Sequence, residues 1–155
     1  MKGLNTAQGQ RLLGECVAEF SRGSSVAAQR TAQLLGTIDL PVTNDAPVPT
    51  STGQTIWDHE MGISPPEYIA HMTVVQSHSP CLSIVQEIYH GLDWYQSEKS
   101  NSPYTQIVGP SCLIDREDFR LGLFLLSENI VYPNHQHSPD EVYIVLAGSG
   151  EWSLN

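Results

Sequence analysis

Two histidines, a glutamate and a tyrosine lie within nine residues of one another in the segment His135-Gln-His137-Ser-Pro-Asp-Glu141-Val-Tyr143. Imidazole nitrogens and carboxylate oxygens are common ligands of divalent transition metals, and two histidines with one carboxylate leave coordination positions for water or substrate. The residue types and their spacing predict a metal site with His135, His137 and Glu141 as ligands. Zn, Fe, Mn, Co and Ni all stay open, because such a set accepts most first-row divalent ions.

A β-hairpin is the element expected to bring these ligands together. Alternate side chains of a strand share a face, so His135 and His137 point the same way. Ser138-Pro139-Asp140 supplies turn residues, and the returning strand places Glu141 and Tyr143 on the face opposite Val142, Ile144 and Leu146. Pairing of the two strands would return Glu141 to the histidines. The other histidines stand singly and are predicted to be surface or core residues: His59, His71, His78 and His90.

Helical spacing of apolar residues dominates the first 37 residues. Asn5 or Thr6 is suited to cap the first helix, and Gly23 is a natural end. A second helix is predicted to begin at Ser24 or Ser25 and to end at Gly36. Residues 1–37 are therefore expected to form a helical hairpin.

Residues 38–100 are predicted to form a connector and then a helix. From Leu40 to Gln54 the chain is rich in Pro, Thr, Ser, Asn and Asp, without a sustained period. Between Pro80 and Ser97 an apolar stripe returns at helical spacing, with Gly91 as its weak point. We expect this helix to pack on the outside of the strands that follow.

After Ser100 the apolar period changes to two, and turn residues separate short apolar runs. The runs Leu121–Leu126 and Val142–Leu146 are predicted strands. Repeated short strands with tight turns favour a barrel or a sandwich over a helical bundle. The chain is thus predicted to be mainly β with N-terminal helices, and residues 101–155 to hold the barrel strands.

The composition argues against several classes of function. Seven Lys and Arg against seventeen Asp and Glu give a net charge of −10, which disfavours nucleic acid and favours a cationic or zwitterionic small ligand. No apolar run has bilayer length and no secretion signal is recognisable, so a soluble, cytoplasmic protein is expected. Cys16, Cys81 and Cys112 lack metal-site spacing and are predicted to be reduced thiols.

The pattern H-x-H-x3-E-x6-G, here His135, His137, Glu141 and Gly148, resembles the first motif of the cupin superfamily, with Asn129 where the motif has its leading glycine. Tyr132 three residues before the first histidine, the H-x-H-x-P-x-E-x-Y core and the helical N-terminal region look like the bacterial dimethylsulfoniopropionate lyases. The resemblance covers residues 80–155 and implies a cupin (jelly-roll) barrel.

Those lyases cleave the zwitterion dimethylsulfoniopropionate to dimethyl sulfide and acrylate by β-elimination. The resemblance implies that His135, His137 and Glu141 hold the metal, that Tyr143 is the base or a further ligand, and that Tyr132 lines the substrate pocket. A divalent cation suits this chemistry, because it acts as a Lewis acid on the substrate carboxylate and favours the phenolate of a nearby tyrosine.

Packing roles stay open for the aromatic residues. Tyr143 and Tyr132 can instead fill a barrel interior, and Trp152 suits core packing better than a pocket wall. Trp57, Trp94 and Tyr95 are assigned to the core or to the contact between helix and barrel.

The second cupin motif, usually G-x5-P-x-G-x2-H-x3-N, does not occur in this sequence. The chain is therefore expected to be the N-terminal part of a longer cupin, with a barrel incomplete at its C-terminus. Weaker metal binding and an open sheet edge after Trp152, available to another chain, would follow. The oligomeric state stays open, a homodimer included.

Two other functions compete with the lyase. One is a different metal cupin enzyme, a dioxygenase or an isomerase, with the same ligands. The other is a cupin module that binds a ligand without turnover. Production of dimethyl sulfide separates the lyase from both.

Overall fold

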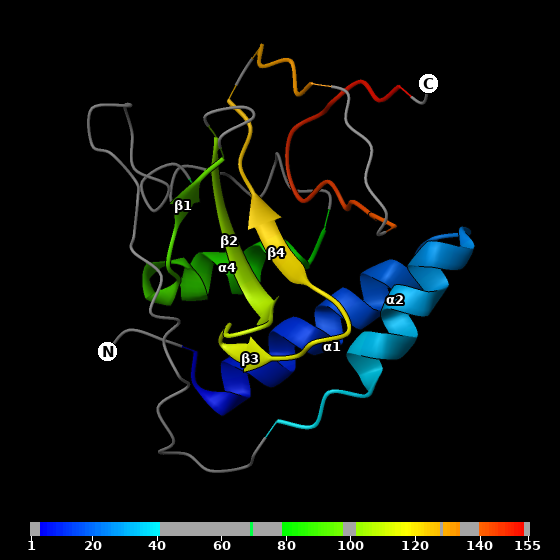
Figure 1. Cartoon of the computed structure of the whole chain (residues 1–155), viewed down its shortest axis with the longest axis vertical. Helices are drawn as coiled ribbons and strands as arrows, with labels where there is room; N and C mark the ends of the chain where they lie inside the picture. The colour runs from blue at the N-terminus through cyan, green and yellow to red at the C-terminus, as the bar shows by residue number, and fades with distance from the viewer. Residues whose placement is uncertain are drawn as a thin grey trace.

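Among the residues that the structure describes, three α-helices lie beside a four-stranded mixed sheet in the computed structural model of the chain (Figure 1). The structure describes residues 4–40, 69, 79–97, 102–127, 129–133 and 140–153. Within them, no helix is long and apolar enough to cross a membrane.

The predicted N-terminal helices are confirmed. Helix α1 spans Thr6–Arg22 and is capped by Asn5, whose side chain accepts a hydrogen bond from the Gln8 amide while the Gln8 side chain accepts one from the Asn5 amide. Helix α2 spans Val26–Gly36 and is capped by the Ser25 hydroxyl. Both helices begin where a polar side chain satisfies amides that have no partner inside the helix.

The third helix is shorter than the sequence predicts. Helix α4 spans Cys81–Ile88, the 3-10 helix η3 continues over Tyr89–Gly91, and strand β1 follows at Tyr95–Gln96. The prediction of a helix up to Ser97 is therefore wrong at its end. Gly91 has low helix propensity, and the backbone beyond it pairs with another strand instead.

Strand β2, Pro103–Gly109, is the centre of the sheet (Figure 1). Strand β1 pairs antiparallel with its beginning, and β3, Ile114–Asp115, pairs parallel with its end. Strand β4, Leu121–Phe124, runs antiparallel to β2, with an irregularity between Gln106 and Val108. The predicted strand from Leu121 thus forms, although it ends at Phe124.

One hydrophobic core joins the helices to the sheet. It includes residues from α1, α2, α4 and β2: Leu12, Leu35, Ile84, Ile107 and Val108 are each no more than 1% exposed. Helix α4 buries five of its eight residues. Helix α4 and strand β2 share this core, and the expected packing of the helix on the outside of a barrel stays a prediction.

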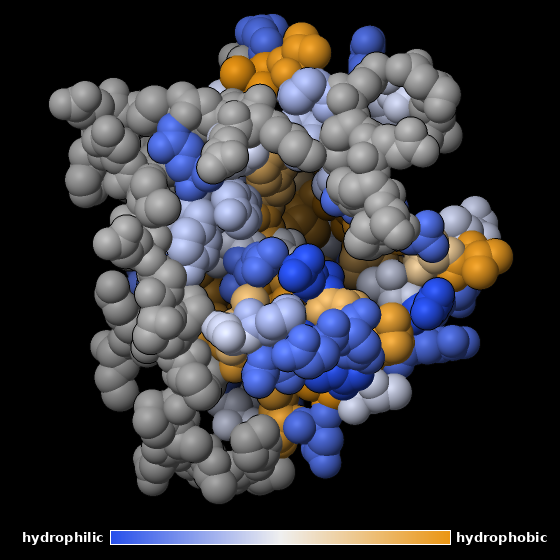
Figure 2. Space-filling model, in the orientation of Figure 1, coloured by the Kyte–Doolittle hydropathy of each residue, from blue (hydrophilic) through white to orange (hydrophobic). Residues whose placement is uncertain are grey.

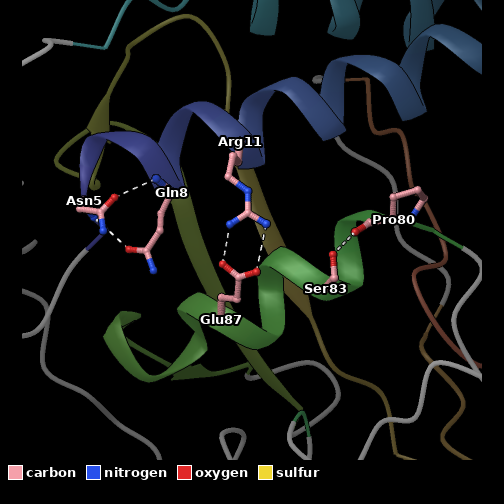
Figure 3. A network of polar contacts seen from close by, with 6 residues as sticks. All are labelled: Asn5, Gln8, Arg11, Pro80, Ser83 and Glu87. Carbon is pink, nitrogen blue, oxygen red and sulfur yellow. Dashed lines mark hydrogen bonds and ion pairs between the residues drawn. The ribbon is translucent and has the colours of Figure 1, made fainter.

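Polar contacts also hold α4 to α1. Arg11 and Glu87 form a two-bond ion pair at 2.6 and 3.0 Å (Figure 3). At the other end of the contact, the Ser79 hydroxyl donates to Glu19 at 2.8 Å. The thiols of Cys16 and Cys81 are buried between the helices, and all three cysteines are free, as predicted.

The strands of the described residues form an open sheet. The cupin barrel implied by the sequence therefore stays a prediction. None of the residues 142–146 belongs to a strand, so the strand predicted there is absent from the described structure. On the face shown in Figure 2, hydrophilic side chains gather over β3 and the loop after it. The surface is hollowed beside β4, and hydrophobic residues lie at the bottom of this hollow.

Candidate metal and substrate site

The segment 140–153 carries two of the five residues singled out in the sequence. Val142, Ile144 and Leu146 pack against the core, whereas Glu141, Tyr143 and Val145 are exposed. The predicted alternation of faces is therefore confirmed, although the ladder is not formed.

Glu141 and Tyr143 are in direct contact. The Tyr143 hydroxyl donates a hydrogen bond of 2.6 Å to Oε2 of Glu141. Partial burial raises the pKa of Tyr143 above its ordinary value, and the hydrogen bond to Glu141 and the charge of that carboxylate raise it further. The negative charge of Glu141 therefore favours the protonated phenol of Tyr143 over its phenolate.

Tyr132 lies close to the same carboxylate. It follows β4 after a turn in which Asn129 has a φ of 60° and the Ile130 amide donates to the Ser127 carbonyl at 3.4 Å. Its ring meets Phe124 edge-on, with centroids 5.2 Å apart. Burial first, and then the charge of Glu141, raises the pKa of Tyr132. The charge of Glu141 therefore acts on both tyrosines, and a shared site of Tyr132, Glu141 and Tyr143 stays a prediction.

Trp152 joins this group although packing was the favoured expectation for it. Its ring lies against the Tyr143 ring, with centroids 5.1 Å apart and planes inclined by 41°, and the residue is 65% exposed. Gly148, with a φ of 80°, lies between the two aromatic residues in the chain. The sequence signal for this contact is the pair Gly148 and Gly150 just before Trp152, because glycines allow the chain to turn back sharply toward Tyr143.

The other aromatic expectations have mixed outcomes. Trp94 is 3% exposed and donates its indole hydrogen to the Tyr89 carbonyl at 3.3 Å, so its core role is confirmed. Tyr95 is half-buried on β1, and its ring lies 5.6 Å from that of Tyr104. Trp57 lies outside the described residues.

His135 and His137 also lie outside the described residues, so their role as ligands stays a prediction. Among the residues that are described, no group of three or more His, Cys, Asp or Glu side chains is placed to hold a metal. Glu141 and Tyr143 nevertheless offer two adjacent oxygen atoms on an exposed face. A carboxylate and a phenol oxygen suit a divalent cation, and the donors present therefore fit the predicted ion.

Comparison of the sequence with known protein families gives a match over residues 67–155. The family model described as dimethylsulfoniopropionate lyase matches this range, which is more than half of the chain and includes every residue of the candidate site. No curated protein and no solved structure matches the chain.

Proposed function

Because the chain belongs to the dimethylsulfoniopropionate lyase family, we propose that it catalyses the cleavage of dimethylsulfoniopropionate to dimethyl sulfide and acrylate. The observation that carries this proposal is the family match over residues 67–155. The contact of Tyr143 with Glu141 supports the proposal, because it places a side chain able to transfer a proton next to a carboxylate able to bind a metal.

The proposed cofactor is a divalent transition metal held by His135, His137 and Glu141, in a site carried by a cupin barrel. When bound, this ion supplies Lewis-acid stabilisation of the negative charge that develops on the substrate carboxylate. Tyr143 contacts Glu141, and the charge of Glu141 acts on Tyr132. Both tyrosines are proposed to bound the pocket on that side.

Tyr143 is the proposed base. Its proton is held by Glu141, because the carboxylate accepts the hydrogen bond and its negative charge opposes a phenolate. A cation held by Glu141 would balance the charge of this carboxylate and would favour the phenolate. The same contact that keeps the tyrosine protonated in isolation therefore makes it responsive to a positive charge at Glu141.

The proposed elimination balances without a further reactant. After the phenol proton of Tyr143 has left to solvent, the phenolate Oη takes the proton from the carbon next to the substrate carboxylate, and the electron pair of that C–H bond forms the new double bond. The bond between the β-carbon and sulfur then breaks, and its electrons leave with sulfur as neutral dimethyl sulfide. A neutral leaving group needs no general acid, so one base is sufficient.

Headspace gas chromatography after addition of dimethylsulfoniopropionate tests the function. We expect dimethyl sulfide from the unmodified chain with added divalent metal and none after treatment with a chelator. Tyr143→Phe is expected to lower turnover by about 100-fold or more, in the range of lost general-base catalysis. Glu141→Gln is expected to lower the metal content as well as the activity.

Tyr95→Phe is the matched control, because it removes a phenol oxygen from strand β1 and leaves the Glu141 contact in place. It is expected to keep full turnover. Absence of dimethyl sulfide from the metal-loaded protein would refute the lyase. Ligand affinity unchanged by Tyr143→Phe, in a protein without turnover, would instead indicate the binding module.

A further inference from the structure

Trp152 is placed where packing does not account for it. Most of a tryptophan's stabilising effect comes from burial of its large ring, yet this residue is 65% exposed. The Trp152 ring contacts the Tyr143 ring, with 5.1 Å between the centroids. Tyr143 is itself 48% exposed. Two aromatic rings thus meet at the surface beside Glu141.

The geometry leaves aromatic surface open next to the proposed reaction centre. The two planes are inclined by 41°, so the rings form an angled pair and not a closed stack. Gly150 contributes no side chain beneath the indole, and a Cβ there would come no closer than 3.8 Å to Nε1 of Trp152. The pair is therefore open to a ligand that uses aromatic faces.

The charge of this part of the chain selects the kind of ligand. From Leu121 to Asn155 the sequence contains no Lys or Arg and four acidic residues: Glu128, Asp140, Glu141 and Glu151. No side chain of the segment therefore competes as a permanent cation for the aromatic faces. An electron-rich ring face in an acidic environment attracts a cation, and tryptophan has the strongest such attraction among the aromatic residues.

We propose that Trp152, held against Tyr143, binds the cationic end of the substrate through its indole face and so selects a sulfonium or quaternary ammonium group over a neutral group of the same shape. This inference rests on the proposed function for the substrate's identity, but the contact itself is defined by the two rings. The methyl groups of such a cation spread the positive charge over an apolar surface, which suits an aromatic face better than a strongly hydrated ammonium does. Trp152 is then a specificity-determining residue, distinct from the base Tyr143.

A pair of ligands that differ only in charge tests the proposal. The first is 3-(trimethylammonio)propionate, and the second is 4,4-dimethylpentanoate, in which carbon replaces the charged nitrogen. Isothermal titration calorimetry on the full chain with metal would give both dissociation constants. We expect the unmodified protein to bind the cationic ligand more tightly, and Trp152→Leu to weaken that binding by roughly 5- to 10-fold. Affinity for the neutral ligand should stay within about twofold.

Two further variants serve as controls. Trp152→Phe keeps a ring with a weaker negative face, and it should retain an intermediate preference for the cation. Val145→Ala removes an exposed apolar side chain from the same face as Tyr143, and it should leave the ratio of the two affinities unchanged. Because Trp152 and Val145 are both exposed, thermal unfolding of the variants should match that of the unmodified protein.

The outcomes separate this inference from the lyase proposal. Equal weakening of both ligands by Trp152→Leu would make Trp152 an apolar wall and overturn the inference, as would a lack of preference or of binding in the unmodified protein. A Trp152-dependent preference for the cation in a protein that releases no dimethyl sulfide would uphold the inference and refute the lyase. In an active enzyme, Trp152→Leu should raise KM for dimethylsulfoniopropionate roughly 5- to 10-fold and change kcat less.

Discussion

Asn129 and Gly148 both have a left-handed backbone conformation. Asn129 precedes the residues of the candidate site in the chain, and Gly148 lies between Tyr143 and Trp152. Their φ angles are 60° and 80°. Most L-residues avoid this region because of their Cβ atom, whereas glycine adopts it freely and asparagine tolerates it. Asn129 stands where the motif quoted in the sequence analysis has its leading glycine, and its backbone conformation is one that glycine adopts freely.

Substitutions at Asn129 should follow this backbone requirement. Asn129→Val is expected to lower the free energy of unfolding by about 1–2 kcal/mol, because a β-branched residue is strained at positive φ. Asn129→Gly should be close to neutral. Urea unfolding of the two variants checks the prediction, and an equal loss in both would show that the asparagine side chain matters more than its φ angle.

Gly148 is expected to be more sensitive than Gly150. A Cβ at Gly148 would meet no other atom within 4 Å, so Gly148→Ala costs only the backbone strain, about 1 kcal/mol. Gly150→Ala has no positive φ to maintain and is the matched control. Near-ultraviolet circular dichroism should change in the first variant, because the contact between Trp152 and Tyr143 depends on the reversal. A change of the same size in Gly150→Ala would contradict this.

At the scale of the elements, the pairing of β2 with β4 depends on Gly122. A Cβ at this position would collide with the Thr105 carbonyl oxygen on the neighbouring strand. The strand β4 leads directly into the turn at Asn129 and on to Tyr132, so its position determines where one side of the site lies.

Gly122→Ala is expected to lower the free energy of unfolding by about 3 kcal/mol, because a backbone atom cannot move aside as a flexible side chain does. Gly14→Ala, in the middle of α1 with no atom near the added Cβ, should raise it by up to about 1 kcal/mol. Thermal unfolding of the pair tests both signs. A neutral effect of Gly122→Ala would mean that β4 does not approach β2 as closely as described.

The elements also show where sequence patterns reach their limit. Caps at Asn5 and Ser25 were predictable, because the side chain that satisfies a helix end is a sequence neighbour of that end. The position of Tyr95 in a strand instead of the expected helix was not predictable, because its pairing partner Tyr104 lies on another element. A helix-like apolar stripe carries no information about a distant strand.

At the scale of the whole molecule, the Arg11–Glu87 ion pair joins residues 76 positions apart and fixes α1 to α4 (Figure 3). The hydrogen bond from Arg11 and its positive charge lower the pKa of Glu87 from its ordinary value of 4.5. A carboxyl with a lowered pKa in the folded state stabilises the fold above its unfolded pKa. That contribution is lost as the pH falls below about 4.5 through the lowered pKa of the folded state.

Glu87→Gln should therefore lower stability at pH 7 and have progressively less effect as the solution is acidified. The effect should be small, because both side chains are about half exposed and salt screens the pair. Urea unfolding across this pH range, repeated in an Arg11→Gln background, is the measurement. If Glu87→Gln has the same effect with and without Arg11, the pair does not contribute.

The sequence alone determined the local features of this protein: the two capped N-terminal helices, the free cysteines, the alternation of faces around Glu141 and Tyr143, and a motif that led to the family. Each of these depends on residues close together in the chain, where caps, turns and periodicity act. The tertiary structure decided that Tyr143 donates to Glu141, that Tyr132 lies near them, and that Trp152 rests exposed on Tyr143. Those contacts depend on how β4 and the reversal at Gly148 place segments in space, and no spacing within the sequence encodes that placement.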